Sequence, residues 1–345
     1  MALLFFDGFE NYNEDADVIA IRNPAISSIT PTSWTYGALG RRSSRGVGGI
    51  HDRTMQYTFV NNYASFVVGI AIYRNSLTVP TYVAGYPLFG FYDGTTLQLG
   101  FYVVGTEIHV YSNGIKLGET SGADISYQTW RYVEVKFTIH NSAGAVEIHV
   151  DGVQRMTPLA DQDTQVSANA YFNIFEFKGL CISVWAYYDD LYMCDLTGTK
   201  NNDFLGDVRV DVLRPDGAGT YTQFTPSAGT NWENVDEVYP DDDTSYNQGS
   251  NVGDKDTYAL AALPAPAGTT IHGVKSQITV RKTDAGAREC KLLTRSGSTD
   301  DLGDTVVLSD SYLTPTKIYE NNPDDSLAWE DADVNAMEVG VQITV

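Results

Sequence analysis

Two short stretches of the chain pair an acid with an imidazole. Glu107-Ile-His-Val110 and Glu147-Ile-His-Val150 each precede a tight-turn dipeptide. Because alternate residues of a strand face the same side, each glutamate would lie beside its histidine, His109 or His149. Carboxylates and imidazoles bind metal ions, so these four side chains on adjacent strands would form a metal site. The alternative, which the pattern favours, is the polar face of a half-exposed sheet.

Tyrosines and glycines crowd a second region, where Tyr82, Tyr86, Tyr92 and Tyr102 lie within about one fifteenth of the chain. Sugars stack on exposed aromatic faces, and the tyrosine hydroxyl can bond to them. These four tyrosines are therefore candidate contacts for a glycan or a partner surface. Most other aromatic side chains of this region are expected to pack between sheets.

The elements that carry these residues are strands. Apolar and polar side chains alternate from residue 55 to 195: Val133 and Phe137 fall on one face of such a run, and Tyr132 and Glu134 fall on the other. Asp-Gly and Asn-Gly dipeptides separate the runs, which is the sequence signal of β-hairpins. The pattern predicts antiparallel sheets with one buried and one solvated face.

The composition excludes several classes of protein. The 345 residues are 43% hydrophobic and 19% charged, which is ample for packed cores. A formal net charge of −22 repels polyanions, so nucleic acid is not an expected partner. No apolar run approaches the roughly 18 residues of a membrane span. The first residues lack the basic start of a signal peptide, so we expect a soluble protein made in a cytoplasm and released by lysis.

A change of composition predicts two domains. Residues 196–203 are polar and rich in turn formers, as a domain junction is. We expect a first β-sandwich at residues 1–196 and a smaller one at residues 197–345.

Two local features leave alternatives open. The basic loop at residues 41–45 is either solvated or contacts an acidic partner subunit. The three cysteines include Cys181 and Cys194, which could pair if their strands are adjacent.

Four stretches of the first part follow a familiar order: Phe5–Glu10, Trp130–Phe137, Val146–Gly152 and Tyr187–Tyr192. A strand led by tryptophan, a strand ending in Asp-Gly and a final strand with Asp-Asp resemble the concanavalin A-like lectin and glucanase jelly rolls, including laminin-G-like domains. The resemblance implies an all-β fold, a concanavalin A-like jelly-roll sandwich followed by a second, smaller β-sandwich.

The same resemblance implies that acids of the first strand lie near the last strand. Asp7 or Glu10 would then meet Asp189 or Asp190, and the four residues become candidate ligands of a structural calcium ion. Calcium needs six or more oxygens, some of them from backbone carbonyls. The alternative is a set of turn acids hydrogen-bonded to the backbone.

Catalytic spacings are missing from the sequence. Glucanases that the chain resembles carry Glu-x-Asp-x-x-Glu or Glu-x-Asp-x-Glu on one strand, where two carboxylates serve as nucleophile and acid. Neither spacing occurs here, nor does a Gly-x-Ser-x-Gly elbow, a phosphate-binding loop or a His-Glu-x-x-His motif. We therefore expect a protein that is not an enzyme, without catalytic residues and without a cofactor beyond a structural calcium ion.

Five further stretches carry a second likeness: Tyr188–Asp195, Asn201–Arg209, Asn234–Glu237, Arg281–Arg288 and Trp329–Gly340. With them, the layout of the whole chain resembles that of proteins encoded in tailed-phage structural gene clusters. The likeness implies a virion protein of the tail fibre or baseplate, with a role in host attachment. Its expected partners are other virion proteins, further copies of itself and a host surface glycan. The alternatives are a capsid decoration protein without a receptor role and, third, a glycan-processing enzyme.

Overall fold

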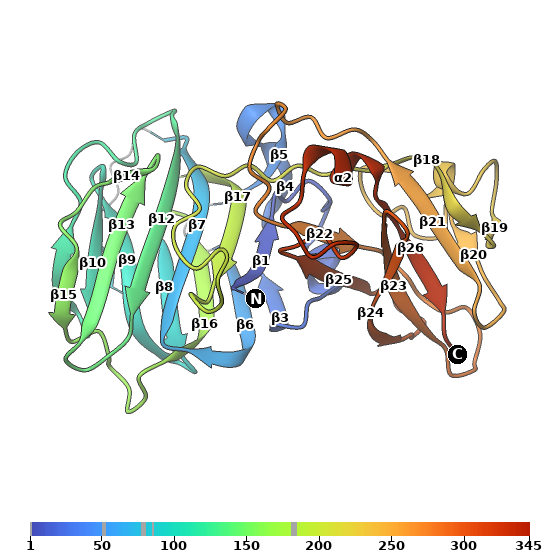
Figure 1. The fold of residues 1–345 in the computed structure, drawn as a ribbon. Coiled ribbons are helices and arrows are strands. Elements are labelled where there is room, and N and C mark those ends of the chain that lie inside the picture. Colours follow the sequence, from blue (N-terminus) through green and yellow to red (C-terminus); the bar gives the residue numbers. More distant parts are fainter. Residues whose placement is uncertain (1, 50–52, 77–80, 85, 181–184) are drawn as a thin grey trace. The chain divides into compact units, whose positions relative to one another are not determined.

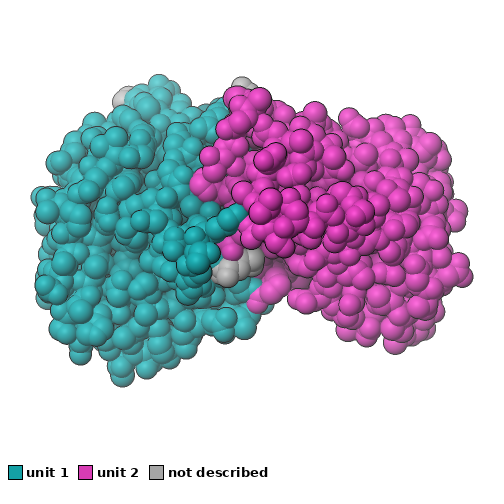
Figure 2. Space-filling view, in the orientation of Figure 1, with its two compact units in different colours: residues 1–19, 25–210 teal, residues 20–24, 211–345 magenta. Residues whose placement is uncertain are grey.

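The protein is described here from a computed structural model that covers residues 2–49, 53–76, 81–84, 86–180 and 185–345. The fold is all-β and forms two compact units (Figures 1 and 2). Unit 1 comprises residues 1–19 and 25–210, and unit 2 comprises residues 20–24 and 211–345. We expected a boundary after residue 196, whereas the division lies after residue 210. In the described part of the chain, no helix is long and apolar enough to span a membrane.

Unit 1 is a sandwich of a nine-stranded and a seven-stranded sheet, which lie one behind the other in Figure 1. The nine-stranded sheet runs β14 (Val153–Gln154), β13 (Gly144–Val150), β12 (Trp130–Thr138), β7 (Ser65–Arg74), β17 (Ala186–Cys194), β5 (Arg45–Gly49), β4 (Thr35–Leu39), with β1 (Leu3–Asp7) beside β17 and β15 (Leu159–Gln162) beside β13. The seven-stranded sheet runs β11 (Ile115–Glu119), β10 (Glu107–Ser112), β9 (Thr96–Val104), β8 (Phe89–Asp93), β16 (Phe172–Lys178), β6 (Thr54–Tyr63), β3 (Ile26–Pro31). Helix α1 (Asp15–Ile19) and the short turn η1 (Arg41–Ser43) connect strands of this unit.

Aromatic side chains fill the space between the two sheets. The ring of Phe91 on β8 lies 4.3 Å from that of Phe137 on β12, and Phe172 on β16 lies 5.1 Å from Phe66 on β7. All four side chains are buried, as the period-two alternation requires of inward positions. Aromatic contacts between the sheets therefore hold the sandwich together and fix which face of each strand points outward.

Residues 201–210, which we call the strap, run over the outer face of the nine-stranded sheet. The backbone N–H of Gly206 donates a hydrogen bond of 2.8 Å to Oε1 of Glu134. The guanidinium of Arg41 lies 5.3 Å from the centre of the Tyr132 ring. Glu134 and Tyr132 have no exposed surface, so the prediction of a solvated face is wrong at these two positions because other segments cover them.

Unit 2 is a smaller sandwich. Its five-stranded sheet runs β18 (Pro215–Thr222), β21 (Lys255–Leu260), β26 (Glu338–Ile343), β23 (Glu289–Ser296), β24 (Thr299–Val307). Its three-stranded sheet runs β2 (Ile21–Arg22), β25 (Thr314–Tyr319), β22 (Val274–Gln277). A hairpin of β19 (Thr225–Pro226) and β20 (Asn247–Gln248), the turn η2 (Trp232–Asn234) and helix α2 (Asp331–Ala336) complete the unit. Strand β2 comes from early in the sequence and pairs parallel to β25.

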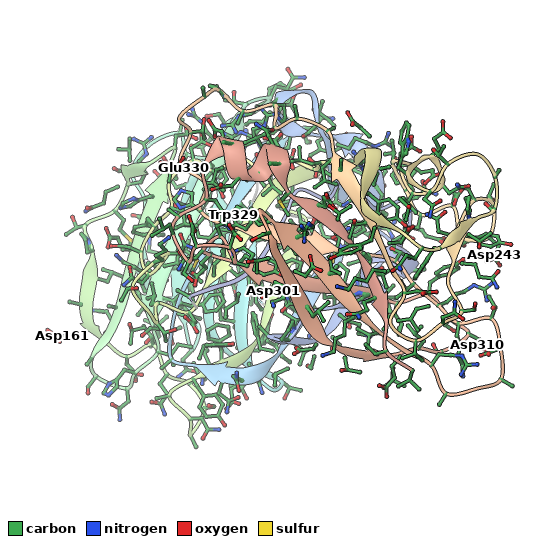
Figure 3. All side chains as sticks on the ribbon, turned by 45° about the vertical axis from the view of Figure 1, so that its right-hand side comes forward. Asp161, Asp243, Asp301, Asp310, Trp329 and Glu330 are labelled. Carbon is green, nitrogen blue, oxygen red and sulfur yellow. The ribbon has the colours of Figure 1, made fainter. Side chains whose placement is uncertain are left out.

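The core of unit 2 lies around one tryptophan. Trp329 is buried together with Tyr319, Val334 and Met337, and Figure 3 shows it beside helix α2. Its indole N–H donates a hydrogen bond of 3.1 Å to the carbonyl of Tyr319. The helix begins with a reciprocal capping box, which satisfies the backbone N–H groups of Glu330 and Asp333.

Candidate functional site

The four predicted calcium ligands lie together in unit 1. Asp7 is the last residue of β1, and its partner on β17 is Leu191, the residue that follows Asp190. Strand β17 carries a bulge at this point, where Asp190 adopts a left-handed backbone with φ of 53°. Bulges change the direction of side chains near functional sites. We call Asp7, Glu10, Asp189 and Asp190 the acid cluster.

Two aspartates of the acid cluster are held by hydrogen bonds to the loop before β5 and to the strap. The carboxylate of Asp189 accepts bonds of 2.6 Å from the Arg41 backbone N–H and from the Ser44 hydroxyl. The carboxylate of Asp190 accepts a bond of 2.8 Å from the Val210 N–H. Both aspartates are buried; burial, followed by the charge of Asp190, raises the pKa of Asp189, and burial raises the pKa of Asp190.

Glu10 is the unusual member of the acid cluster. Burial, followed by the charges of Asp189, Asp7 and Asp190, raises the pKa of Glu10 to about 9. Its Oε2 is buried and has no hydrogen-bond partner among the described residues. The side chain folds back over Gly8, where an added Cβ would come within 2.1 Å of Oε2. A carboxylate oxygen without a donor, amid three further acids, fits the oxygen chemistry of a calcium ion.

The basic loop at residues 41–45 has its acidic partners within unit 1. The Arg41 guanidinium lies 3.4 Å from Asp190 and also pairs with Asp207 of the strap. Arg42 lies 3.2 Å from the same Asp207 carboxylate. We expected this loop to be solvated or to contact an acidic partner subunit. Instead, Arg41 and Arg42 pair with acids of the same unit.

The four candidate sugar-contacting tyrosines lie on the outer face of the seven-stranded sheet. Tyr102 and Tyr92 point outward because Phe101 and Phe91 beside them fill the core. Each ring lies over a glycine of its own strand: a Cβ on Gly100 would come within 2.8 Å of the Tyr102 ring.

Tyr111 on β10 lies opposite Gly100 and joins this group. The rings of Tyr82 and Tyr111 are stacked with centres 4.3 Å apart, and Tyr82 lies 4.8 Å from Tyr102. We call Tyr82, Tyr86, Tyr92, Tyr102 and Tyr111 the tyrosine platform. Its members differ in access to solvent: Tyr82 and Tyr86 are 36% and 46% exposed, whereas Tyr102 is 3% exposed beneath its neighbours.

Polar groups lie among the rings of the platform. Glu176 on β16 lies opposite Gly90 and accepts a hydrogen bond of 3.1 Å from Gln56. The Lys178 ammonium is 3.1 Å from Glu176 and 5.6 Å from the Tyr86 ring centre. Burial and the neighbouring Glu176 carboxylate raise the pKa of Tyr92, which keeps its hydroxyl protonated. The face therefore combines flat apolar rings with an acid, an amide, an ammonium and a hydroxyl.

The two Glu-x-His pairs do not form a joint metal site. His109 lies on β10 of the seven-stranded sheet and His149 on β13 of the nine-stranded sheet. The His149 imidazole lies 2.9 Å from Glu147, and the ring of Phe204 stacks on it at 3.9 Å. The hypothesis that the two pairs lie on adjacent strands is wrong, because the β10–β11 hairpin and the β12–β13 hairpin belong to different sheets of the sandwich. Cys181 of the suggested cysteine pair lies outside the described residues.

Sequence reasoning missed Tyr111 and Glu176 as members of the outer face. Alternation alone assigns them to a polar side, but only the pairing register brings Tyr111 opposite Gly100 and Glu176 opposite Gly90. Two glycines paired across β8 and β9, each followed two residues later by a tyrosine, were the available signal.

No protein-family model matches the chain, and no curated protein does. Among solved structures it is similar to domain 4 of an extracellular family 43 arabinanase from Geobacillus stearothermophilus, in complex with arabinotriose (12% identity, TM-score 0.36, 56% of this chain and 92% of that one). It is also similar to the catalytic domain of a glycoside hydrolase family 131 protein from Coprinopsis cinerea (12%, 0.34, 60% and 99%). A third is a carbohydrate esterase of the Shiga toxin-encoding bacteriophage phi24B (16%, 0.32, 50% and 89%).

These comparisons correct one expectation. We expected a protein that is not an enzyme. That expectation is wrong, because structures similar to this chain include a glycoside hydrolase catalytic domain and a carbohydrate esterase. The all-β, jelly-roll type of sandwich is common to the chain and these structures. At this level of identity the likeness concerns the fold.

Proposed function

We propose that unit 1 binds a glycan on the tyrosine platform. The observation that carries this proposal is the stack of Tyr82 on Tyr111 above the buried Tyr102, with ring centres 4.3 to 5.3 Å apart. A ring held by two neighbours loses little conformational freedom when a sugar stacks on it. Because Gly90 and Gly100 have no side chain, the rings of Tyr92 and Tyr102 lie close over the sheet, and rings of neighbouring strands can contact one extended ligand.

The polar groups of the platform suit the hydroxyls of a sugar. Pyranose rings present apolar C–H faces and polar edges, so a binding face needs aromatic rings beside donors and acceptors. Glu176 offers an acceptor, and Gln56 and Lys178 offer donors. The three side chains already contact one another, which holds them in place before a ligand arrives.

We place this binding activity in a tailed-phage virion, as a protein of the tail fibre or baseplate that attaches the particle to its host. This assignment rests on the likeness of residues 188–195 and 201–209 to phage structural proteins. Other virion proteins and further copies of the chain would be its partners, and host surface glycan its receptor. A decoration protein of the head remains the alternative.

A glycan array tests the binding proposal. The full chain is expected to bind host-surface oligosaccharides, and Tyr82→Ala to weaken binding about tenfold or more, as loss of a central aromatic contact does. Tyr127→Ala is the matched control, because Tyr127 is also 36% exposed but lies in the loop before β12. Equal binding by wild type and Tyr82→Ala would refute the platform as the binding face.

Two further measurements separate the alternatives. Mass spectrometry of each bound oligosaccharide after incubation distinguishes binding from processing, since release of a smaller sugar would identify an enzyme. Immunogold labelling of intact particles locates the protein. Label on tails supports attachment, and label on heads without glycan binding supports decoration.

The acid cluster supports a second role in the same unit, a structural calcium ion. Glu10 and Asp189 would supply carboxylate oxygens to it, with Asp7 and Asp190 beside them. The supporting observation is the buried Oε2 of Glu10, which lacks a hydrogen-bond partner in the described structure. When bound, the ion would neutralise charge between the end of β1 and the bulge of β17. Unchanged melting after chelation would contradict this role.

A further inference from the structure

A group of two acids and one imidazole lies at one end of the seven-stranded sheet, apart from the acid cluster. Nε2 of His109 is 3.4 Å from Oε2 of Glu107 and 3.1 Å from Oε2 of Glu119. One ligand atom from each of the three side chains lies within 4.8 Å of the other two. We call these residues the Glu–His–Glu group.

The hairpin of β10 and β11 builds this group. His109 lies directly opposite Glu119 across the strand pair, and Glu107 lies two residues before His109 on the same face. Ile108 and Val110, on either side of His109, are buried in the core and fix the direction of the imidazole. His109 itself is 8% exposed, so the ring is held within the sheet surface and does not move freely in solvent.

The spacing of the three atoms suits a tetrahedral metal ion. Zinc bonds of about 2.0 to 2.2 Å to nitrogen and oxygen place neighbouring ligand atoms roughly 3.3 to 3.6 Å apart at tetrahedral angles. The 3.1 and 3.4 Å separations at His109 need only small adjustments by the two glutamates, whose side chains are 41% and 45% exposed. Three protein ligands of this kind leave a coordination position open for water or a ligand.

A lysine is the natural competitor of such an ion. The Lys116 ammonium lies 2.8 Å from the Glu119 carboxylate oxygen that faces His109. Its side chain is 42% exposed, so it can turn into solvent when a divalent ion takes its place. An exposed pair of this kind contributes little stability, so a divalent ion can displace the lysine.

We propose that Glu107, His109 and Glu119 bind a divalent transition-metal ion, zinc by the chemistry of its ligands. The site shares no ligand residue with the tyrosine platform, although His109 lies opposite Tyr102 across the β9–β10 pair, and zinc binding is measured without a glycan. The imidazole selects this class of ion over calcium and magnesium, which prefer oxygen ligands.

The chain contains its own control. The tetrapeptide Glu-Ile-His-Val occurs at residues 107–110 and again at 147–150, with an acid two residues before each histidine. At the second copy, Lys136 lies 3.1 Å from Glu147 and the ring of Phe204 covers the imidazole of His149. No second acid contacts His149 among the ion pairs of the described residues.

Isothermal titration of the EDTA-treated, dialysed full chain with zinc chloride tests the proposal. Wild type is expected to bind one ion at this site, His109→Gln to bind at least about tenfold more weakly, and His149→Gln to bind as wild type does. Lys116→Met is expected to bind more tightly, because it removes the competing cation. Cobalt substitution should give the absorption of a tetrahedral site in wild type and lose it in Glu119→Gln.

Circular dichroism of each variant checks that it is folded. No zinc binding by folded wild type would overturn the proposal, and so would equal affinities of wild type and His109→Gln. Weakened binding in His149→Gln with unchanged binding in His109→Gln would move the site to the other hairpin and refute the assignment. A tighter Lys116→Met variant with the cobalt spectrum would support the geometry directly.

Discussion

We predict that a substitution of the buried Glu10 stabilises the protein. The pKa of its carboxyl rises from 4.5 to about 9 on folding because the group is buried and surrounded by acids. At pH 7 the unfolded chain has released the proton and the folded chain keeps it, so folding must take up a proton. From pH 4.5 to 7 this uptake costs about 3 kcal/mol, and the cost grows until the pH passes the folded pKa.

Glu10→Gln removes that cost, because glutamine has the shape of the protonated acid and carries no charge at any pH. In EDTA at pH 7, unit 1 of Glu10→Gln is expected to be more stable than wild type by up to about 3 kcal/mol, and at pH 5 by less than about 1 kcal/mol. Protection of the β1 and β17 amides in hydrogen–deuterium exchange, corrected for intrinsic rates, reports this unit alone.

The test is whether Glu10→Gln raises or lowers the stability of unit 1. Adding calcium should stabilise wild type more than Glu10→Gln, because the variant lacks one of the two carboxylates proposed to bind the ion. Glu14→Gln, exposed in the same loop, is the control and should behave as wild type in both conditions. If Glu10→Gln is less stable than wild type at pH 7 in EDTA, Glu10 is ionised in the folded chain and the reasoning fails.

Two further substitutions examine the platform and the strap. Gly100→Ala places a Cβ within 2.8 Å of the Tyr102 ring. It should lower glycan affinity several-fold in array binding and lower stability by about 1 to 3 kcal/mol in thermal melting. Gly217→Ala is the control, because the nearest atom to its Cβ is 3.6 Å away, and it should change neither quantity. Phe204→Ala removes the ring that contacts His149 and Lys136, so protease cleavage within the strap should become faster. Mass spectrometry of the fragments measures the rate of cleavage. Asn202→Ala, at an exposed position of the strap, is the control and should be cleaved at the wild-type rate. Cleavage at the wild-type rate in Phe204→Ala would show that the hydrogen bonds and ion pairs of the strap hold it without this ring.

Much of the fold of unit 1 could be predicted from alternation and turns. Val133 and Phe137 are buried and Asp151-Gly152 forms the predicted turn, because both depend on local backbone preferences. The strap could not be predicted, since its bond from Gly206 to Glu134 joins residues far apart in sequence and its composition is that of a linker. A polar segment that contacts a sheet through a few single residues has no hydrophobic periodicity in its sequence, so its position on the sheet cannot be predicted from that pattern.

The candidate sites divide in the same way. The proximity of Asp7 to Asp190 was expected from a resemblance and not from the residues, because it depends on a bulge that no local pattern announces. The tyrosines could be chosen from their crowding, but the burial of Tyr102 depends on Tyr111 of the next strand. Pairing register, which sequence constrains weakly, decides which of these side chains meet a ligand.

Strand β2 has a consequence for how such proteins can recombine. Residues 20–24 belong to unit 2, yet they interrupt the sequence of unit 1. A single crossover between two related genes that falls between residues 24 and 314 joins the β2 of one parent to the β25 of the other. Ile21 and Arg22 would then have to pair with a foreign Thr314 and Pro315, so we expect the two units to be inherited together or exchanged with matched β2 segments.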